Sequence, residues 1–240
     1  MKRGVGYKVF CIAVFAVLIS AHWSTGSMGS DMVQRLVAAD GAAGEEFGNT
    51  IAIDGNTAVI GAPSADNNRG AAYILTRSYN GSWTQQAKLQ ADTSQQFDFF
   101  GSSVALHGKT IVVGAKGYGR NQGAAYVFTN DNQEWTLEAK FRADDGAPGD
   151  NFGASIALRG DTILAGAYGD DGSAGAAYIF QRTARRWAEQ IKLTAATRIP
   201  NQMFGKAVAL SYDTAVIGTL DRATWNGAAY IFERKANGWQ

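Results

Sequence analysis

Five aspartates are the side chains of this sequence best suited to chemistry. They form two dense groups, which are Asp144, Asp145 and Asp150, and Asp170 with Asp171. Carboxylate oxygens close together can ligate a hard cation, and a pair of carboxylates can act as acid and base in the cleavage of a sugar bond. Asp is also an ordinary turn former, because its side chain bonds to nearby backbone. The sequence leaves both interpretations open.

Three aromatic residues lie in similar polar surroundings and extend this set. A loop aromatic beside Asp and Asn can stack on a sugar ring or anchor a peptide side chain. The alternative is that each ring covers the end of its own sheet. The candidate ligand-binding residues are therefore Tyr118, Tyr168, Trp225, Asp144, Asp150, Asp170 and Asp171.

Other catalytic groups are scarce. The chain has two histidines, His22 and His107, and one cysteine, Cys11. Metal-assisted hydrolysis and Cys or Ser/His nucleophilic catalysis need clusters that these residues do not form. We expect no catalytic residue, no metal site and no cofactor. The alternative is a carbohydrate-active enzyme that uses the loop carboxylates.

The elements that position these residues are repeated. Each of four units contains a Phe-Gly pair, a Gly-Ala or Gly-Thr pair, an Ala-Ala-Tyr run and a Trp, in that order. The landmarks are Phe47, Gly61, Tyr73 and Trp83; Phe100, Gly114, Tyr126 and Trp135; Phe152, Gly166, Tyr178 and Trp187; and Phe204, Gly218, Tyr230 and Trp239. Successive Phe-Gly pairs are 53, 52 and 52 residues apart. A fixed period of this length indicates a repeat architecture.

Each unit predicts four short strands, A to D. In the first unit these are residues 51–53, 58–61 and 71–74, and a strand that begins at Trp83 and runs through 88–91. A tight Gly turn joins A to B, and no helical periodicity is present. A four-stranded antiparallel meander repeated about every 52 residues is typical of a propeller blade. The sequence therefore predicts an all-β fold, a β-propeller of four-stranded antiparallel blades.

Spacing also predicts how the ring closes. Each Phe of a Phe-Gly pair follows an apolar strand-D residue by 11 positions, and these residues are Leu36, Leu89, Phe141 and Leu193. Residues 35–38 are thus expected to form a strand D that completes the last blade and removes two open edges. A chain closed in this way would be a monomer. The alternative is four blades of a larger ring, completed by another chain or by lost sequence.

The units resemble the FG-GAP repeats of integrin α-chain-like propellers and their bacterial relatives. The resemblance is carried by the Phe-Gly pairs together with Gly61-Ala62-Pro63, Gly114-Ala115, Gly166-Ala167 and Gly218-Thr219. It covers residues 34–240 and implies a propeller in an extracellular setting with a role in adhesion or binding. The family usually has seven blades, and many of its repeats carry an Asp-x-Asn-x-Asp-Gly calcium loop between strands A and B. All four units lack that loop, so calcium is not carried over.

The expected binding surface is the end of the blades that carries the B–C and D–A connections. These connections differ between units, whereas the A–B turns are short and uniform, and variable loops on a repeated frame are where binding residues gather. The expected function is a binding or adhesion module that recognises an extracellular protein or glycan. A structural or truncated repeat protein without a ligand of its own is the remaining alternative.

The first thirty residues predict export. A basic start is followed by an apolar run from Val9 to Ala21, which matches a signal peptide and is short for a membrane span. We assign 1–30 to a signal peptide and leader and 31–240 to the propeller, located outside the cell, in the periplasm or on the cell surface. The net charge of +1 gives no basic patch for nucleic acid, and the mature chain has no predicted membrane span.

Overall fold

The computed structural model describes residues 34–240, except 92, 132–133, 185 and 222–223. The predicted leader, residues 1–30, lies outside the described residues. The chain divides into one unit that ends at Leu36 and a second unit, Val37–Gln240, and the fold described below is that of the second unit. Among the described residues, no helix is long and apolar enough to span a membrane.

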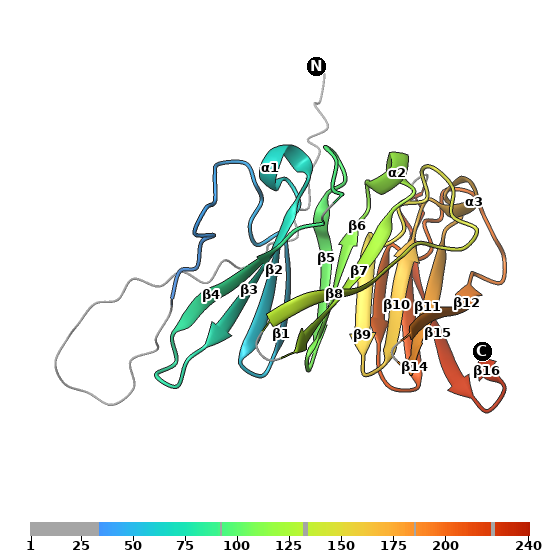
Figure 1. The fold of residues 1–240 in the computed structure, drawn as a ribbon. Helices are drawn as coiled ribbons and strands as arrows, with labels where there is room; N and C mark the ends of the chain where they lie inside the picture. Colours follow the sequence, from blue (N-terminus) through green and yellow to red (C-terminus); the bar gives the residue numbers. More distant parts are fainter. Residues whose placement is uncertain (1–33, 92, 132–133, 185, 222–223) are drawn as a thin grey trace, which may run out of the picture. The chain divides into compact units, whose positions relative to one another are not determined.

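Four antiparallel sheets of four strands follow one another along the chain, so the predicted blades are confirmed (Figure 1). Each blade contains strands A to D in sequence order. The strands are β1 (Thr50–Asp54), β2 (Thr57–Ala62), β3 (Ala71–Arg77) and β4 (Trp83–Leu89) in blade 1; β5 (Phe100–His107), β6 (Thr110–Ala115), β7 (Ala124–Asp131) and β8 (Glu134–Phe141) in blade 2; β9 (Ser155–Arg159), β10 (Thr162–Ala167), β11 (Ala176–Thr183) and β12 (Arg186–Leu193) in blade 3; and β13 (Ala207–Leu210), β14 (Thr214–Leu220), β15 (Gly227–Lys235) and β16 (Gly238–Trp239) in blade 4.

The core lies between blades rather than within them. Strand B of blades 2 and 3 is buried along its whole length, because each of its two faces packs against a neighbouring blade. Ile74 of blade 1 packs in one cluster with Phe100 and Val104 of blade 2. Ile179 of blade 3 packs in the same way with Phe204 of blade 4. Because both faces of each sheet carry apolar side chains, each sheet needs a neighbouring sheet to cover them.

The joint between blades is made by the Phe-Gly turn. The backbone N–H of Phe100 donates to the carbonyl of Arg69 at 3.0 Å, and Phe152 and Phe204 repeat the bond onto the preceding blade at 3.0 Å. Gly123 adopts φ +88°, and a Cβ placed there would lie 2.1 Å from the carbonyl oxygen of Phe152. The Phe-Gly and Gly-Ala-Ala-Tyr landmarks are therefore the two sides of one joint.

The B–C connections of blades 1 to 3 share one backbone although their side chains differ. Their single turns are α1 (Ala65–Asn68), α2 (Tyr118–Asn121) and α3 (Asp170–Ser173). Each contains consecutive residues with φ and ψ near +60° and +50°, such as Asp66 and Asn67, so each is a left-handed turn. The expected variability between these loops thus lies in the side chains alone.

The predicted ring closure is not shown. The fourth strand of the last sheet is β16, which pairs with Arg234 and Lys235 of β15, and residues 34–38 form no strand. Further along, the N–H of Ala39 donates to Gln85 at 3.0 Å, and Asp40 pairs with Lys88 at 2.6 Å. These bonds attach residues 39 and 40 to β4 of blade 1.

The joint predicts a large difference between two glycines of blade 2. Gly108, in the A–B turn, has φ +57° and open space around it, so Gly108→Ala costs only the backbone strain, about 1 kcal/mol. Gly123→Ala adds the clash with Phe152, and we expect a loss of about 2–5 kcal/mol of unfolding free energy. Urea denaturation of both variants measures the difference. Equal losses would contradict the proposed role of the joint.

Candidate functional site

The B–C turns and D–A loops lie at one end of the blades, where Figure 1 shows α1, α2 and α3. We call this end the loop face. It holds all seven candidate residues, because six lie in the B–C and D–A connections of blades 2 and 3 and Trp225 lies in the B–C connection of blade 4. The structure places them in three different environments.

Asp170 is the centre of an ion network. Its carboxylate is nearly buried and accepts hydrogen bonds from Lys192 at 2.9 Å and Arg198 at 2.8 Å. Lys192 also pairs with Asp145 at 2.6 Å, and Arg198 with Asp171 at 3.2 Å. Three carboxylates are thus balanced by two cations that come from strand D and the following D–A loop.

The hydroxyl of Tyr178 also belongs to this network. It donates to Asp145 at 2.8 Å and lies 3.3 Å from Asp170, and burial together with these acceptors raises the pKa of Tyr178. Burial alone would raise the pKa of Asp145, but the hydrogen bonds from Lys192 and Tyr178 outweigh it and hold that pKa below its usual value. The network ties five segments together, which are the D–A loop before blade 3, its B–C turn, its strands C and D, and the D–A loop that follows.

The Asp170 network is not arranged as a cation site. Lys192 and Arg198 occupy the positions that a metal would need on its carboxylates. In the part of the chain that the structure describes, no group of three or more His, Cys, Asp or Glu side chains could hold a metal ion. The chemistry available here is ionic cross-linking of loops.

Asp150 belongs to a repeated turn. Its buried carboxylate accepts the backbone N–H of Ala147, three residues earlier, at 2.6 Å. Asp98 bonds to Gln95 in the same way at 2.8 Å, and Glu45 to Ala42 at 2.9 Å. Each acid stands two positions before a Phe-Gly pair and fixes the turn that delivers it. Burial raises the pKa of Asp150, and the nearby Asp170 adds to that rise.

Two of the three candidate aromatics are covered by cations. Lys140 Nζ lies 3.6 Å from the ring centroid of Tyr118, and Tyr118 also packs against the core between blades 1 and 2. Lys206 Nζ lies 4.2 Å from the centroid of Tyr168. Trp225 differs, because 75% of its surface is exposed. It also adopts φ +60°, a conformation that bulky residues rarely take.

The remaining carboxylates are accessible from solvent. Asp144 is exposed and uses only its backbone N–H to bond Glu189, at 3.2 Å. Asp171 has a side chain that is 65% exposed, although it pairs with Arg198. The structure therefore brings Asp170 and Asp171 together with Asp145. Trp225 belongs to the B–C connection of blade 4.

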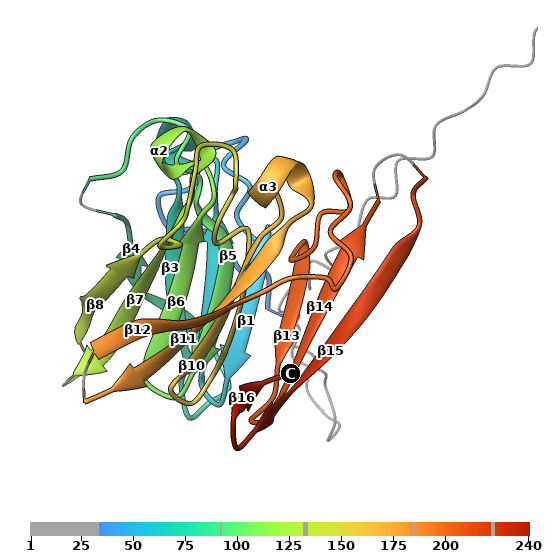
Figure 2. The same ribbon diagram turned by 90° about the vertical axis from the view of Figure 1, so that its right-hand side faces the viewer.

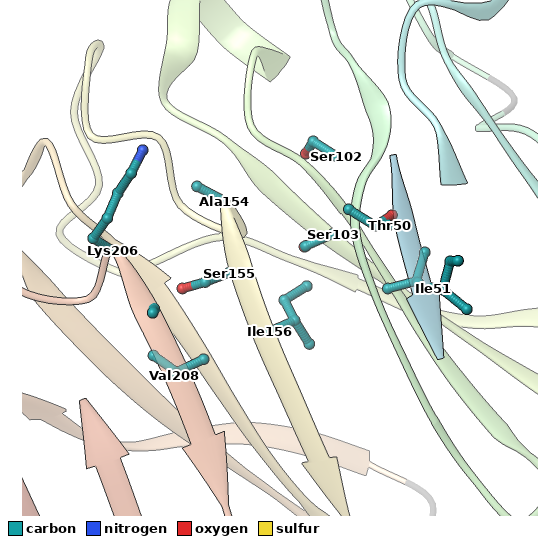
Figure 3. Close-up of a pocket in the computed structure, with 11 residues that line it drawn as sticks. Thr50, Ile51, Ser102, Ser103, Ala154, Ser155, Ile156, Lys206 and Val208 are labelled. Atoms are coloured by element: carbon teal, nitrogen blue, oxygen red, sulfur yellow. The ribbon is translucent and has the colours of Figure 1, made fainter. Parts of the chain in front are cut away.

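A shallow hollow of 370 Å³ opens between the four A strands (Figure 3). Its lining includes Thr50, Ser103, Ser155 and Lys206. Three hydroxyls in it are already engaged, since Thr50, Ser103 and Ser155 donate to the carbonyls of Gly101, Gly153 and Gly205 at 2.9, 2.6 and 2.7 Å. The hollow is therefore lined by residues that join the blades.

Sequence reasoning missed the lysines of strand D. Lys88, Lys140 and Lys192 each lie over the ring of their own blade's Ala-Ala-Tyr tyrosine, at 5.4, 5.0 and 5.4 Å. Lys88 and Lys192 also bind an acid of the preceding D–A loop. Their spacing of 52 and 52 residues in the sequence is the signal that could have found them.

Comparison with known proteins identifies the repeats. A family model described as FG-GAP repeat matches the chain four times, over residues 31–75, 83–128, 135–180 and 187–232. These segments make up more than half of the chain, and each contains one Phe-Gly pair and one Ala-Ala-Tyr run. No curated protein matches the chain significantly.

The Asp150 turn predicts a charge-dependent effect. Asp150→Asn keeps an acceptor for Ala147 and removes a buried charge, so we expect its stability at pH 7 to equal or exceed that of the wild type. Asp150→Ala loses the acceptor and should be about 1–2 kcal/mol less stable than Asp150→Asn.

The pH dependence gives a second readout of the same substitution. Because the folded-state pKa of Asp150 is raised, its charged form is disfavoured in the fold, and the wild type should gain stability relative to Asp150→Asn as the pH falls through that pKa. Thermal unfolding between pH 7 and pH 3 measures this. A wild type that loses ground to the amide variant on acidification would contradict the assignment.

Proposed function

Because this chain belongs to the FG-GAP repeat family, we propose that it is a binding module that recognises an extracellular protein or glycan through its loop face. The repeats build a frame whose strands pack between blades and whose A–B turns are short. The loop face is where side chains vary without changing the backbone. This proposal extends the family assignment to a surface and a partner class.

The observation that carries the proposal is the exposure of Trp225. The turn positions equivalent to it hold Asn68, Asn121 and Ser173, all with φ between 64° and 66°. A tryptophan at this position costs backbone strain of about 1–2 kcal/mol and exposes an apolar ring. Strained backbone clusters at sites that contact ligands, and a Trp presents a large apolar ring together with one polar N–H group.

Accessible polar residues on the same face complete the proposed contact set. Asp171 and Asp144 remain open to solvent, as do Asp66 and Arg120 in the B–C turns of blades 1 and 2. These side chains are spread over several blades rather than gathered in a deep pocket. A broad surface of this kind suits a macromolecular partner. The loops that carry this surface are held in place by less accessible residues, which are Asp150, Asp170 and Tyr118.

Catalysis has less support than binding. The densest carboxylates, Asp145, Asp170 and Asp171, are held by Lys192 and Arg198. A glycoside-cleaving pair needs two carboxyls on either side of an open sugar site. The same carboxylates serve here as ionic links between loops. We therefore propose no catalytic role and no cofactor.

A secreted or cell-surface location is part of the proposal. It is supported by the basic and apolar pattern of residues 1–21 in the sequence and by the extracellular setting that the family resemblance implies. Purification of the protein from the culture medium or the cell surface of its host would test the location directly.

Substitution of two aromatics on blade 4 tests the binding surface. Trp225 lies on the loop face, and Tyr212, 60% exposed, lies in the A–B turn at the opposite end of the same blade. The probes are an array of glycans and a panel of purified extracellular proteins. For any ligand that the wild type binds, we expect Trp225→Ala to weaken affinity at least tenfold, about 1.4 kcal/mol, and Tyr212→Ala to leave it unchanged.

Two controls make this result decisive. The molar mass and melting temperature of each variant show whether the change acts through binding rather than through folding or self-association. Equal effects of Trp225→Ala and Tyr212→Ala would contradict the loop-face proposal, and so would a screen in which the wild type binds no probe.

A further inference from the structure

The two end faces of the blade series are exposed where inner blades are buried. Ile231 of β15 is 67% exposed, whereas its counterparts Ile74, Val127 and Ile179 are fully buried against the next blade. On blade 1, Ile51 and Ile53 are 54% and 64% exposed. Their counterparts in blade 2, Val104 and Leu106, are buried. Exposed apolar faces of this kind mark an interface.

Blade 4 has a glycine, Gly218, at a position where the other blades need glycine for a close backbone contact. A Cβ on Gly61, Gly114 or Gly166 would lie 2.0–2.2 Å from the Phe-Gly carbonyl of the following blade. Gly218 occupies the same position in blade 4, and among the described residues a Cβ there would meet only Ala207, at 3.5 Å. Blade 4 thus has room for a Phe-Gly turn that no described residue fills. We call this space, formed around Gly218 and Ile231, the socket.

Blade 1 carries the matching projection, which we call the plug, formed by Phe47 and Gly48. A Cβ on Gly101 or Gly205 would meet the preceding blade at 2.3 or 2.2 Å, whereas one on Gly48 would meet no described atom within 4 Å. Phe47 contacts Tyr73 of its own blade and is half-buried, whereas Phe100, Phe152 and Phe204 are fully buried.

Strand β15 also has an open edge in the part of the chain that the structure describes. In blades 1 to 3 strand D pairs with strand C up to the Ala-Ala-Tyr run. In blade 4, β16 and Gln240 pair only with residues 233–235, so residues 227–232 have no described strand on that side (Figure 2). The apolar residues Leu36 and Val37 precede the plug at strand-D spacing.

We propose that a second copy of this chain occupies the socket, inserting its Phe47-Gly48 plug beside Gly218 and laying residues 35–38 along the edge of β15. The contact repeats the joint found three times within the chain. Because plug and socket lie at opposite ends of the blade series, two copies satisfy both at once. The product is a ring of eight blades, within the range of about 4–8 that propellers adopt.

Among the described residues, the joint that would close the ring within one chain is not formed. The three internal joints share the same hydrogen bonds and the same bridges, Gly70 to Phe100, Gly123 to Phe152 and Gly175 to Phe204. A Cβ on Gly48 would meet no described atom within 4 Å, and one on Gly218 would meet only Ala207, so the plug and the socket of one chain do not make this contact with each other. In Figure 1, β1 and β14 lie on either side of β5 and β9.

One residue makes the new joint weaker than the internal ones. Thr50, Ser103 and Ser155 donate a hydroxyl hydrogen bond across each internal joint. The fourth position is Ala207, which has no donor. The joint between copies is therefore expected to be reversible, with a dissociation constant accessible to dilution.

The experiment is the molar mass of the purified full chain, measured by light scattering and sedimentation over a wide concentration range. We expect the wild type to approach twice the mass of one chain. Gly218→Ala fits the single chain and blocks the socket, so it should remain a monomer with unchanged melting. Ile231→Asp is a second socket variant, with Tyr212→Ala as the exposed control.

Ala207→Ser supplies a gain of function. Restoring the missing hydroxyl at both joints of the dimer should tighten association roughly 5- to 100-fold, the combined effect of two neutral hydrogen bonds. A mixture of Gly218→Ala with Phe47→Ala chains retains one intact plug and one intact socket, so it should form dimers that neither variant forms alone.

Two results would contradict the proposed dimer. A wild type that stays monomeric at the highest concentration would overturn the proposal in favour of closure within one chain or a different partner. A dimer that survives both socket variants would place the contact on another face. Neither result depends on ligand binding at the loop face, so this proposal and the proposed function can fail separately.

Discussion

Each joint between successive blades brings two backbones closer than any side chain permits. At Gly114 and Gly166 a Cβ would lie 2.0 Å from the carbonyl oxygen of the next blade's Phe-Gly glycine. That approach lets the buried Phe152 and Phe204 enter the space between sheets and align the apolar faces on both sides. Without it, each four-stranded sheet would expose two apolar faces, and no blade would be stable alone.

The same approach explains the unusual B–C turns. To present their carbonyls to the incoming Phe-Gly turn, these segments of blades 1 to 3 take left-handed conformations over three residues, which include Arg120 and Ser173. Left-handed backbone is costly for residues other than glycine. Because the turn is fixed by the joint, its exposed side chains are held rigidly and can differ between blades without disturbing the fold. Rigid display of different side chains reduces the entropy lost on binding.

Much of the fold could be predicted from the sequence, because the repeat phase reports it directly. The blades, their strand order and the short A–B turns all follow from landmarks spaced 52 or 53 residues apart. The position of residues 35–38 does not, since it depends on the angle at each joint, and no local pattern encodes that angle. Asp150 shows a different limit. Its carboxylate serves a repeated turn, and only comparison with Asp98 and Glu45 separates that role from ligand binding.

The Asp170 network illustrates why the chemistry of a site is harder to predict than its fold. Asp170 meets Lys192, 22 residues away, and Arg198, 28 residues away, and neither spacing follows from strand or helix periodicity. The partners meet because strand D and the next D–A loop pass the B–C turn of the same blade. Blade 1 repeats part of this arrangement with Lys88 and Asp40, whereas in blade 2 Lys140 covers Tyr118. The repeat pattern thus predicts the position of a side chain in its blade. Whether that side chain links two loops or stays accessible to a partner depends on the neighbouring residues, which differ from blade to blade.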